Sequence, residues 1–408
     1  MTTATSEVNS LNLKGLDELF KSGPSWLQHF RQEAAAHFSK QPFPTMSQEH
    51  WRRTDPERVR PQGQTLLVPN STFEVQGCAQ TPVGVKFQAI ESGLEEVQSQ
   101  LFTVAGLDRY NLFAALNGAA FQGGTHVVVD KDTSTGEGIL TATHRFTGAG
   151  LAATRSYIEV GAGASATVAE VFEAGGEDVL ANPVLEVHVK QGARLRYIFV
   201  NAWGPGSSIV PTIHVRVEKD AYFQMLFVGL GGILTKCFVE SDLVGEGGKS
   251  EVLGIVLAHG RQHYDVDVQQ NHRVGPTVSD VLFHVALTDR SRSIFGGNIL
   301  CEPGAQKIDG YQQNRNLMLS DKARADSMPR LEIEANDVRC THGASFSTYD
   351  ADQRFYLQSR GLSQEEAEHL LVTGFFSEVI ARLDHTVAEE WVERLANEKM
   401  NTVLATKK

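Results

Sequence analysis

The feature that most constrains the fold of this chain is a turn that recurs every 27 to 31 residues. Between the turns lie short runs of alternating apolar and polar residues, such as TRSYIEV, RLRYIFV and IHVRVEK, which are typical of strands. A constant period of this size indicates a solenoid in which each repeat stacks on the next. Because no period contains a helical face, the sequence predicts a β-helix. The turn residues that mark the period are Gly161, Gly192, Asp220, Gly247, Gly275 and Gly304.

Residues 11–60 precede the repeats and show the spacing of a helix. Apolar residues recur there at steps of three to four, which is the pattern of one helical face. Pro42 and Pro44 are expected to end this helix. Residues 61–80 contain Pro, Gly, Asn and Ser and are interpreted as a connection. The residues on the apolar face are Trp26, Leu27, Phe30, Ala34 and Phe38.

Helix is predicted again after Gly361. Ser363 and Glu366 have the spacing of a capping box, in which each side chain binds a free backbone N–H at the start of a helix. Gly374 is expected to separate two helices. A helical segment at this position is suited to cap the solenoid. Its apolar stripe consists of Leu370, Leu371, Phe375, Val379, Ile380 and Leu383.

Composition excludes several classes of partner and location. The net charge of −12 argues against a nucleic-acid partner, which would need a basic surface. No run of eighteen apolar residues is present, so no membrane span is predicted. The first dozen residues lack the features of a secretory signal, and the four cysteines form no CxxC pair. We therefore expect a cytoplasmic protein.

Two patterns that could indicate chemistry are weak. The glycine-rich segments fit no GxxxxGK[ST] motif, so this chain is expected to bind and hydrolyse no nucleotide. His259 and His263 lie near His272 and His284 in the sequence, and histidines grouped in this way are candidate metal ligands. Histidines four apart on a strand have Cα atoms about 13 Å apart. We therefore interpret this group as coil-stacking or solvent-facing residues.

The segment Cys340-Thr341-His342 is the stronger candidate for a metal site. Alternation along a strand places Cys340 and His342 on the same side, about 6.6 Å apart. Thiolate and imidazole are both ligands of iron in iron–sulfur clusters. Taken alone, the Cys-x-His pair is a weak signal, because a cysteine is more often a small packed hydrophobe. The remaining cysteines, Cys78, Cys237 and Cys301, are interpreted as packed thiols.

Four blocks around this segment point to a family. They are residues 303–307 (PGAQK), 313–320 (QNRNLMLS), 324–343 and 354–361 (RFYLQSRG). Together they closely resemble the signature core of the SufB/SufD family of iron–sulfur cluster assembly scaffolds. The N-terminal segment WLQHFRQEAAAHF resembles the D-type members.

The resemblance implies a non-catalytic scaffold subunit of the D type. B-type members carry a functional cysteine where this chain has Asn314, and a His-Glu pair where it has His342-Gly343. The resemblance also implies that Cys340 and His342 help to form a nascent cluster site at the contact with a B-type subunit. His342 would be a metal ligand completed by that partner, and the cofactor would be a transient iron–sulfur cluster.

Further partners follow from the same resemblance. They are a B-type subunit at the C-terminal solenoid end, a SufC-type ABC ATPase and, indirectly, a cysteine desulfurase. When the chain is alone, a second copy could take the place of the B-type subunit. No nucleic acid and no membrane are expected as partners. The C-terminal helices would then be a docking surface for the ATPase. This role and the role of a cap on the solenoid are both possible for these helices. The residues expected at the subunit interface, on an alternating strand, are Arg354, Tyr356 and Arg360. Those expected to dock the ATPase are Leu370, Leu371, Phe375, Phe376 and Val379.

The predicted fold is mainly β, with a right-handed parallel β-helix (solenoid) core flanked by N-terminal and C-terminal α-helical regions. The expected divisions are a helical region with its connection (1–75), the β-helix core (76–336), and a region of interface strands and docking helices (337–408). Two other functions remain open. A secreted-type β-helix enzyme acting on polysaccharide would need clustered carboxylates, whereas the acidic residues here are dispersed. A homodimeric structural protein would be indifferent to the ATPase.

Overall fold

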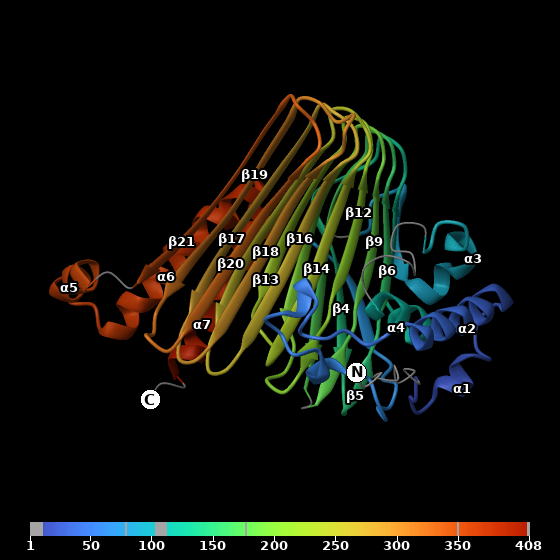
Figure 1. The fold of residues 1–408 in the computed structure, drawn as a ribbon, viewed down its shortest axis with the longest axis horizontal. Coiled ribbons are helices and arrows are strands. Elements are labelled where there is room, and N and C mark those ends of the chain that lie inside the picture. Colours follow the sequence, from blue (N-terminus) through green and yellow to red (C-terminus); the bar gives the residue numbers. More distant parts are fainter. Residues whose placement is uncertain (1–10, 78–79, 103–111, 176–177, 349–350, 406–408) are drawn as a thin grey trace, which may run out of the picture.

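Two facing sheets of parallel strands form a β-solenoid of about eight turns, with helices at both ends of the chain (Figure 1). The computed structural model describes residues 11–77, 80–102, 112–175, 178–348 and 351–405. Two sequence-based expectations lie outside these ranges. They are the packed thiol of Cys78 and the lack of a secretory signal in the first ten residues. The predicted fold class is confirmed.

The first sheet has nine strands. From β4 onward, neighbouring strands pair in parallel with each residue opposite its equivalent one turn later, as in Phe199 opposite Phe227. The period of the sequence is therefore one turn of the solenoid. The strands in spatial order are β1 (Asn70–Gln76), β4 (Ser134–Phe146), β7 (Ser165–Ala174), β10 (Arg194–Ala202), β13 (Tyr222–Gly229), β15 (Lys249–Ala258), β17 (Thr277–Leu287), β19 (Ile308–Met318) and β21 (Val338–Thr348).

The second sheet has twelve strands and faces the first. Three short strands, β5 (Gly150–Ala152), β8 (Val179–Ala181) and β11 (Ser208–Ile209), branch from β14. At the N-terminal end β2 pairs antiparallel with β3, and β1 likewise with β4. The remaining strands are β2 (Val85–Ala89), β3 (Thr125–Val129), β6 (Arg155–Val160), β9 (Val184–Val189), β12 (Thr212–Val217), β14 (Leu234–Leu243), β16 (His263–His272), β18 (Arg292–Cys301) and β20 (Arg324–Ile333).

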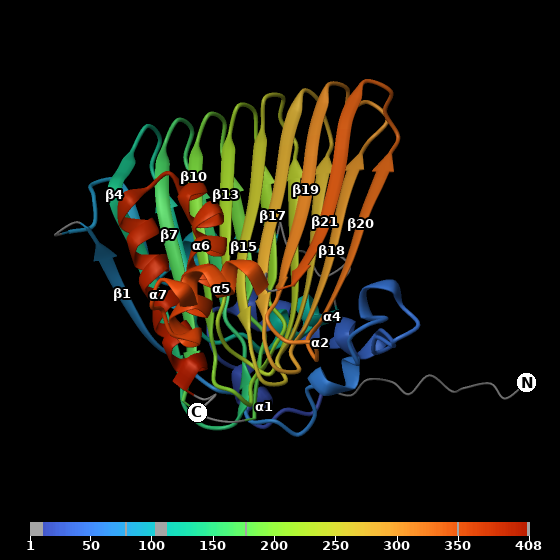
Figure 2. The ribbon, with the colours of Figure 1, turned by 90° about the vertical axis from the view of Figure 1, so that its left-hand side faces the viewer.

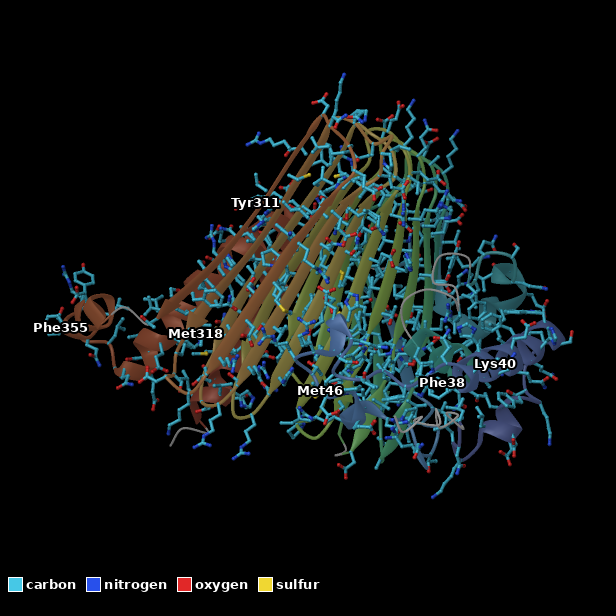
Figure 3. All side chains as sticks on the ribbon, viewed as in Figure 1. Phe38, Lys40, Met46, Tyr311, Met318 and Phe355 are labelled. Carbon is cyan, nitrogen blue, oxygen red and sulfur yellow. The ribbon has the colours of Figure 1, made fainter. Side chains whose placement is uncertain are left out.

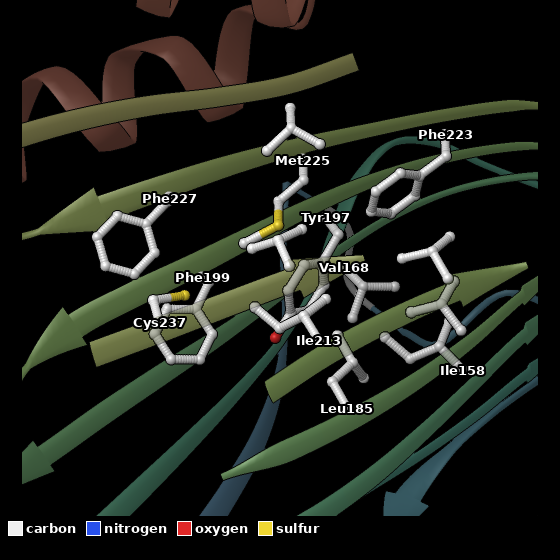
Figure 4. Close-up of a cluster of buried hydrophobic side chains, with 14 of the residues drawn as sticks. Ile158, Val168, Leu185, Tyr197, Phe199, Ile213, Phe223, Met225, Phe227 and Cys237 are labelled. Carbon is white, nitrogen blue, oxygen red and sulfur yellow. The ribbon is translucent and has the colours of Figure 1, made fainter. Parts of the chain in front are cut away.

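Apolar side chains from both sheets fill the lumen between them (Figure 4). The rings of Phe199 and Phe227 stack with centroids 5.6 Å apart, one turn above the other. The next strand has Gly254 opposite Phe227. A Cβ atom there would lie 2.2 Å from the ring of Phe283 on the following turn. The glycine therefore provides the space that this phenylalanine fills.

The N-terminal helices cover the outer face of the twelve-stranded sheet. Their buried residues, among them Phe38, Trp51 and Phe113, form one cluster with Leu151 and Tyr157 of the sheet. The helix predicted within residues 11–60 is confirmed, because Leu27, Ala34 and Phe38 are buried on one face of α2. The elements are α1 (Leu16–Leu19), α2 (Ser25–Lys40), η1 (Glu49–Trp51), η2 (Pro56–Val59), η3 (Ile90–Gly93), α3 (Leu94–Val97) and α4 (Leu112–Ala120).

Three sequence-based boundaries differ from the structure. The connection predicted over residues 61–80 contains β1, which pairs along its length with β4. The β-helix core predicted over residues 76–336 includes α4, whose residues are nearly all buried because the helix packs between α2 and the sheet. The solenoid also continues past residue 336, because β21 pairs with β19 from Val338 to Thr348.

The C-terminal helices cover the outer face of the nine-stranded sheet (Figure 2). The capping box of Ser363 and Glu366 is confirmed at the start of α6. The helix break predicted at Gly374 is wrong, because α6 continues through it and the chain turns at Asp384, where φ is 48°. None of the described helices is long and apolar enough to cross a bilayer. The elements are α5 (Ala351–Ser359), α6 (Gln364–Ile380), η4 (Ala381–Leu383) and α7 (Thr386–Ala405).

Candidate functional site

Cys340 and His342 lie on β21, the last strand of the solenoid. They stand opposite Gly310 and Gln312 of β19, and both of those residues are buried on the lumen side of their strand. Cys340 and His342 therefore share the face of β21 that continues the lumen, as the alternation of the strand predicts.

The thiol of Cys340 meets a second thiol across the end of the lumen. Its Sγ lies 3.7 Å from Sγ of Cys301, which ends β18 in the opposite sheet. The β19 residue beside Cys340 is Gly310, and a Cβ atom there would lie 3.3 Å from Sγ of Cys340 and 3.1 Å from Ile299. Because Gly310 has no side chain, the two thiols can approach each other.

The two thiols differ in exposure and in pKa. Cys301 is fully buried in a small apolar cluster with Ile299 and Ile308, and Cys340 packs against that cluster while partly exposed. The hydrogen bond from Cys301 and a further one from the backbone of Gly310 lower the pKa of the Cys340 thiol. The same contact and burial raise the pKa of Cys301. Cys340 is therefore the first of the pair to become a thiolate.

The end of the solenoid beside these residues is open. Among the described strands, β21 pairs with β19 alone and β20 with β18 alone. His342 is exposed there, and so are Phe346 (53%) on the same face of β21 and Ile333 (38%) on β20. An open edge with exposed apolar side chains is a template for pairing with another chain.

Asn314 is a buried residue of the lumen. Its Oδ1 accepts a hydrogen bond of 2.7 Å from Asn316 on the same strand. Asn316 in turn donates to the carbonyl oxygen of Ser345 in the next turn. The hydrogen bond from Asn316 thus links two neighbouring turns through a side chain and the backbone. Asn314 therefore completes a packed polar contact at the position where the family resemblance predicts a cysteine in B-type members.

The residues expected on an interface strand lie elsewhere in the secondary structure. Tyr356 is on helix α5 and Arg360 follows its end, so the predicted strand is wrong. The alternation of this short run fits a helix as well, and Arg360 lies over the ring of Tyr356 one turn earlier, 5.1 Å from its centroid. The side chain of Arg354 lies outside the described part. Helix α5 projects beyond the last strands, with Phe355 72% exposed at its surface (Figures 1 and 3).

The five residues expected to dock an ATPase divide between two environments. Phe376 and Val379 are buried against the nine-stranded sheet, and Phe375 is partly buried with its ring stacked on His284 at 4.3 Å. Leu371 is partly exposed, whereas Leu370 is 52% exposed. The helix therefore covers the sheet with one face and presents another to solvent.

The four histidines considered as metal ligands do not meet. His259 contacts Lys399 at 3.0 Å, and His263 contacts Thr54 at 2.8 Å. His284 donates to the carbonyl oxygen of Phe375 at 2.6 Å. The fourth, His272, is enclosed by the hydroxyls of Thr277 and Ser279. Their separate partners support the structural interpretation.

The sequence did not reveal two ionic clusters on the outer face of the twelve-stranded sheet. In the first, His214 lies 3.5 Å from Glu240 and 3.4 Å from Asp242, and the three ligand atoms lie within 4.8 Å of one another. Arg273 already binds Asp242 at 2.7 Å. In the second, the buried ammonium of Lys236 binds Asp265 at 2.8 Å. In both clusters, two carboxylates lie two residues apart on one strand and so share a face, and this spacing could have predicted the clusters from the sequence.

Comparison with known proteins gives a consistent result. Residues 143–375 match the domain family described as SUF system FeS cluster assembly, SufBD core domain. An iron-sulfur cluster assembly SufBD family protein of Mycobacterium tuberculosis is 31% identical over 274 residues, 65% of this chain and 68% of that protein.

Two further relatives come from other bacteria. A SufBD family protein of Synechocystis is 32% identical over 50% of this chain and 45% of its own length. The iron-sulfur cluster assembly protein SufD of Escherichia coli is 29% identical over 56% of this chain and 54% of its own length.

Proposed function

The chain belongs to the SufB/SufD family of iron–sulfur cluster assembly proteins, and from this premise we propose that it is the D-type, non-catalytic subunit of a SufBCD-type scaffold complex. In this proposal it pairs with a B-type subunit through its open solenoid end. The two subunits together hold the nascent cluster, which is cargo that the complex builds and passes on. A cysteine desulfurase would supply sulfur to the complex.

The placement of Cys340 and His342 is the observation that carries the proposal. Both side chains lie on the last strand, on the lumen face, beside the open edges of β20 and β21. Thiolate and imidazole are ligands suited to iron–sulfur clusters. A second solenoid that adds strands to this edge would bring its own ligands next to them.

The D-type assignment is supported by Asn314. This side chain is buried and hydrogen-bonded, so it offers neither a thiolate nor an open position to a cluster. Gly343 follows His342 and provides no carboxylate. The chain alone would then supply half of a site, and the B-type partner would supply the rest.

We place the ATPase docking surface on the solvent side of α6. Leu370 and Leu371 carry it, because Phe376 and Val379 are already buried in the contact with the sheet. This arrangement gives the C-terminal helices both of the roles that the sequence left open. Movement of α6 by the ATPase would act on the sheet that ends at β21. Such a change requires the ATP-bound state to prefer the rearranged form.

His342→Ala tests the proposal in the complex with a B-type subunit and the ATPase. We expect the variant complex to assemble, since His342 is exposed. Removal of a ligand should reduce the yield of cluster by about tenfold or more, measured by visible absorption after anaerobic reconstitution. His29→Ala, at an exposed position on α2, is the control. A full cluster yield from the His342 variant would contradict the site assignment.

A further inference from the structure

We propose that Cys301 is a metal ligand, and that Cys301 and Cys340 together form a two-thiolate seat for one soft divalent cation at the end of the lumen. The inference deepens the proposed function. It rests on that function only for the identity of the natural ion, which would be Fe²⁺ carried as cargo. The seat itself follows from the geometry of the two thiols.

The distance between the sulfur atoms suits one tetrahedral ion. Metal–sulfur bonds of about 2.3 Å at the tetrahedral angle place two thiolate sulfurs about 3.8 Å apart. Sγ of Cys301 and Sγ of Cys340 are 3.7 Å apart. An ion could therefore bind between them with little movement of either strand.

The fold holds the two thiols at this distance from opposite sheets. Cys301 ends β18, two residues before the turn at Pro303, and Cys340 lies near the start of β21. The position beside Cys340 on β19 is Gly310, where any side chain would press on Cys340 and on Ile299. A glycine at this position keeps the path between the thiols clear.

An ion held by the two thiolates would have its remaining coordination positions on the outer side of the pair. Apolar residues enclose the inner side of the pair, among them Ile299 and Ile308. The outer side faces the open end, where His342 follows on the same face of β21. Further ligands can reach the ion from His342, from water or from a partner subunit. Soft thiolates of this kind favour Fe²⁺ or Zn²⁺ over Mg²⁺ and Ca²⁺.

Cys237 shows what a purely packed thiol looks like in the same lumen. It is fully buried in the main apolar cluster, and burial raises its pKa. Among the described residues, the contact of Cys301 with Cys340 is the one thiol–thiol contact. Cys237 is therefore a matched control for Cys301.

Binding involves no change of oxidation state. Two S–H bonds are broken, two metal–sulfur bonds form, and two protons leave to solvent for each divalent ion bound. Metal binding to thiols is accordingly weaker at lower pH.

Anaerobic titration of the full chain with Co²⁺ alone, in the presence of a phosphine reductant, tests the seat. We expect a sulfur-to-cobalt charge-transfer band that Zn²⁺ removes by competition. Cys301→Ser and Cys340→Ser should each weaken Co²⁺ binding by about tenfold or more and lower the band. Cys237→Ser should leave both unchanged. Equal behaviour of the Cys301 and Cys237 variants would overturn the proposal.

A measurement on the unmodified chain guards against variants that fold poorly. X-ray absorption of the Zn²⁺-loaded protein should show two sulfur atoms at about 2.3 Å from zinc. One sulfur or none would overturn the proposal. These experiments use the isolated chain and a metal ion, so their outcome is separate from that of cluster formation in the complex. A two-sulfur site together with full cluster yield from His342→Ala would leave the seat standing and remove the proposed role of His342.

Discussion

Glycines on the lumen side of the strands determine which larger side chains can meet there. Gly310 leaves room for the contact between Cys301 and Cys340, and Gly254 leaves room for the ring of Phe283. Protein interiors are close-packed, so a single added methyl group is felt at such positions. By contrast, Gly374 lies within α6, and a Cβ atom there would meet nothing within 4 Å.

Two glycine-to-alanine substitutions should therefore have opposite effects on stability. Gly254→Ala places a methyl group against Phe283 and should lower the free energy of unfolding by about 1–3 kcal/mol. Gly374→Ala, in an open helical position, should raise it by about 0.5–1 kcal/mol. Urea unfolding followed by circular dichroism measures both. A stable Gly254 variant would show that the lumen can repack around the ring.

Among the elements, the N-terminal segment from η1 to η2 is held to the twelve-stranded sheet by buried polar contacts. Lys236 of β14 lies between two carboxylates of β16 and 5.8 Å from the ring centroid of Trp51 in η1. Burial alone would lower the pKa of Lys236, but the charges of Asp265 and Asp267 outweigh the effect of burial and raise that pKa.

Thr54 of the same segment contacts both His263 and Asp265. Burial lowers the pKa of His263 to about 3, assisted by the nearby cations Arg292, Arg58 and Lys236.

This contact should make the stability of the protein fall in acid. The unfolded chain takes up a proton at His263 near its ordinary value of about 6.5, whereas the folded protein does so only near pH 3. The contribution of His263 is therefore fully present above pH 6.5 and decreases by about 1.4 kcal/mol per pH unit below it. Melting temperatures from pH 8 to pH 4 should show this slope, and His263→Gln should reduce it. His29→Gln, at an exposed position on α2, is the control, and equal slopes for all three proteins would contradict the prediction.

At the scale of the whole molecule, the two ends of the solenoid are different. The N-terminal end is closed by the antiparallel strands β1 and β2, and each sheet has helices on its outer face. At the C-terminal end, β20 and β21 offer open edges and helix α5 projects beyond them (Figure 1). Exposed Phe346 and Phe355 lie at this end. This end is therefore where we expect a partner to bind.

Phe346→Lys should weaken association at this end. We expect the affinity for a B-type subunit, or for a second copy when the chain is alone, to fall by about tenfold or more, because the apolar side chain would lie within the contact. Val278→Lys, at a 40% exposed position on the outer side of β17, should have no effect. Sedimentation velocity measures both. Association of the Phe346 variant at the affinity of the unmodified chain would place the contact elsewhere.

Short-range patterns were sufficient for much of the fold. The period of 27 to 31 residues predicted the solenoid, since each turn must repeat the last to satisfy its strands. The capping box at Ser363 and the helical face of α2 depend on neighbours within two turns of helix, and both were predicted correctly. The segment around Tyr356 was not, because so short a run fits a strand and a helix equally well.

For the candidate site, the sequence by itself determined the residue types and the shared face of Cys340 and His342, because both follow from alternation along one strand. Only the tertiary structure could show that Cys301 lies 3.7 Å from Cys340, since the two residues belong to different sheets and are 39 positions apart. It also showed that Phe376 faces the sheet while Leu370 faces solvent. Contacts of this kind depend on how the turns and helices stack on one another, and a local sequence pattern cannot predict this stacking.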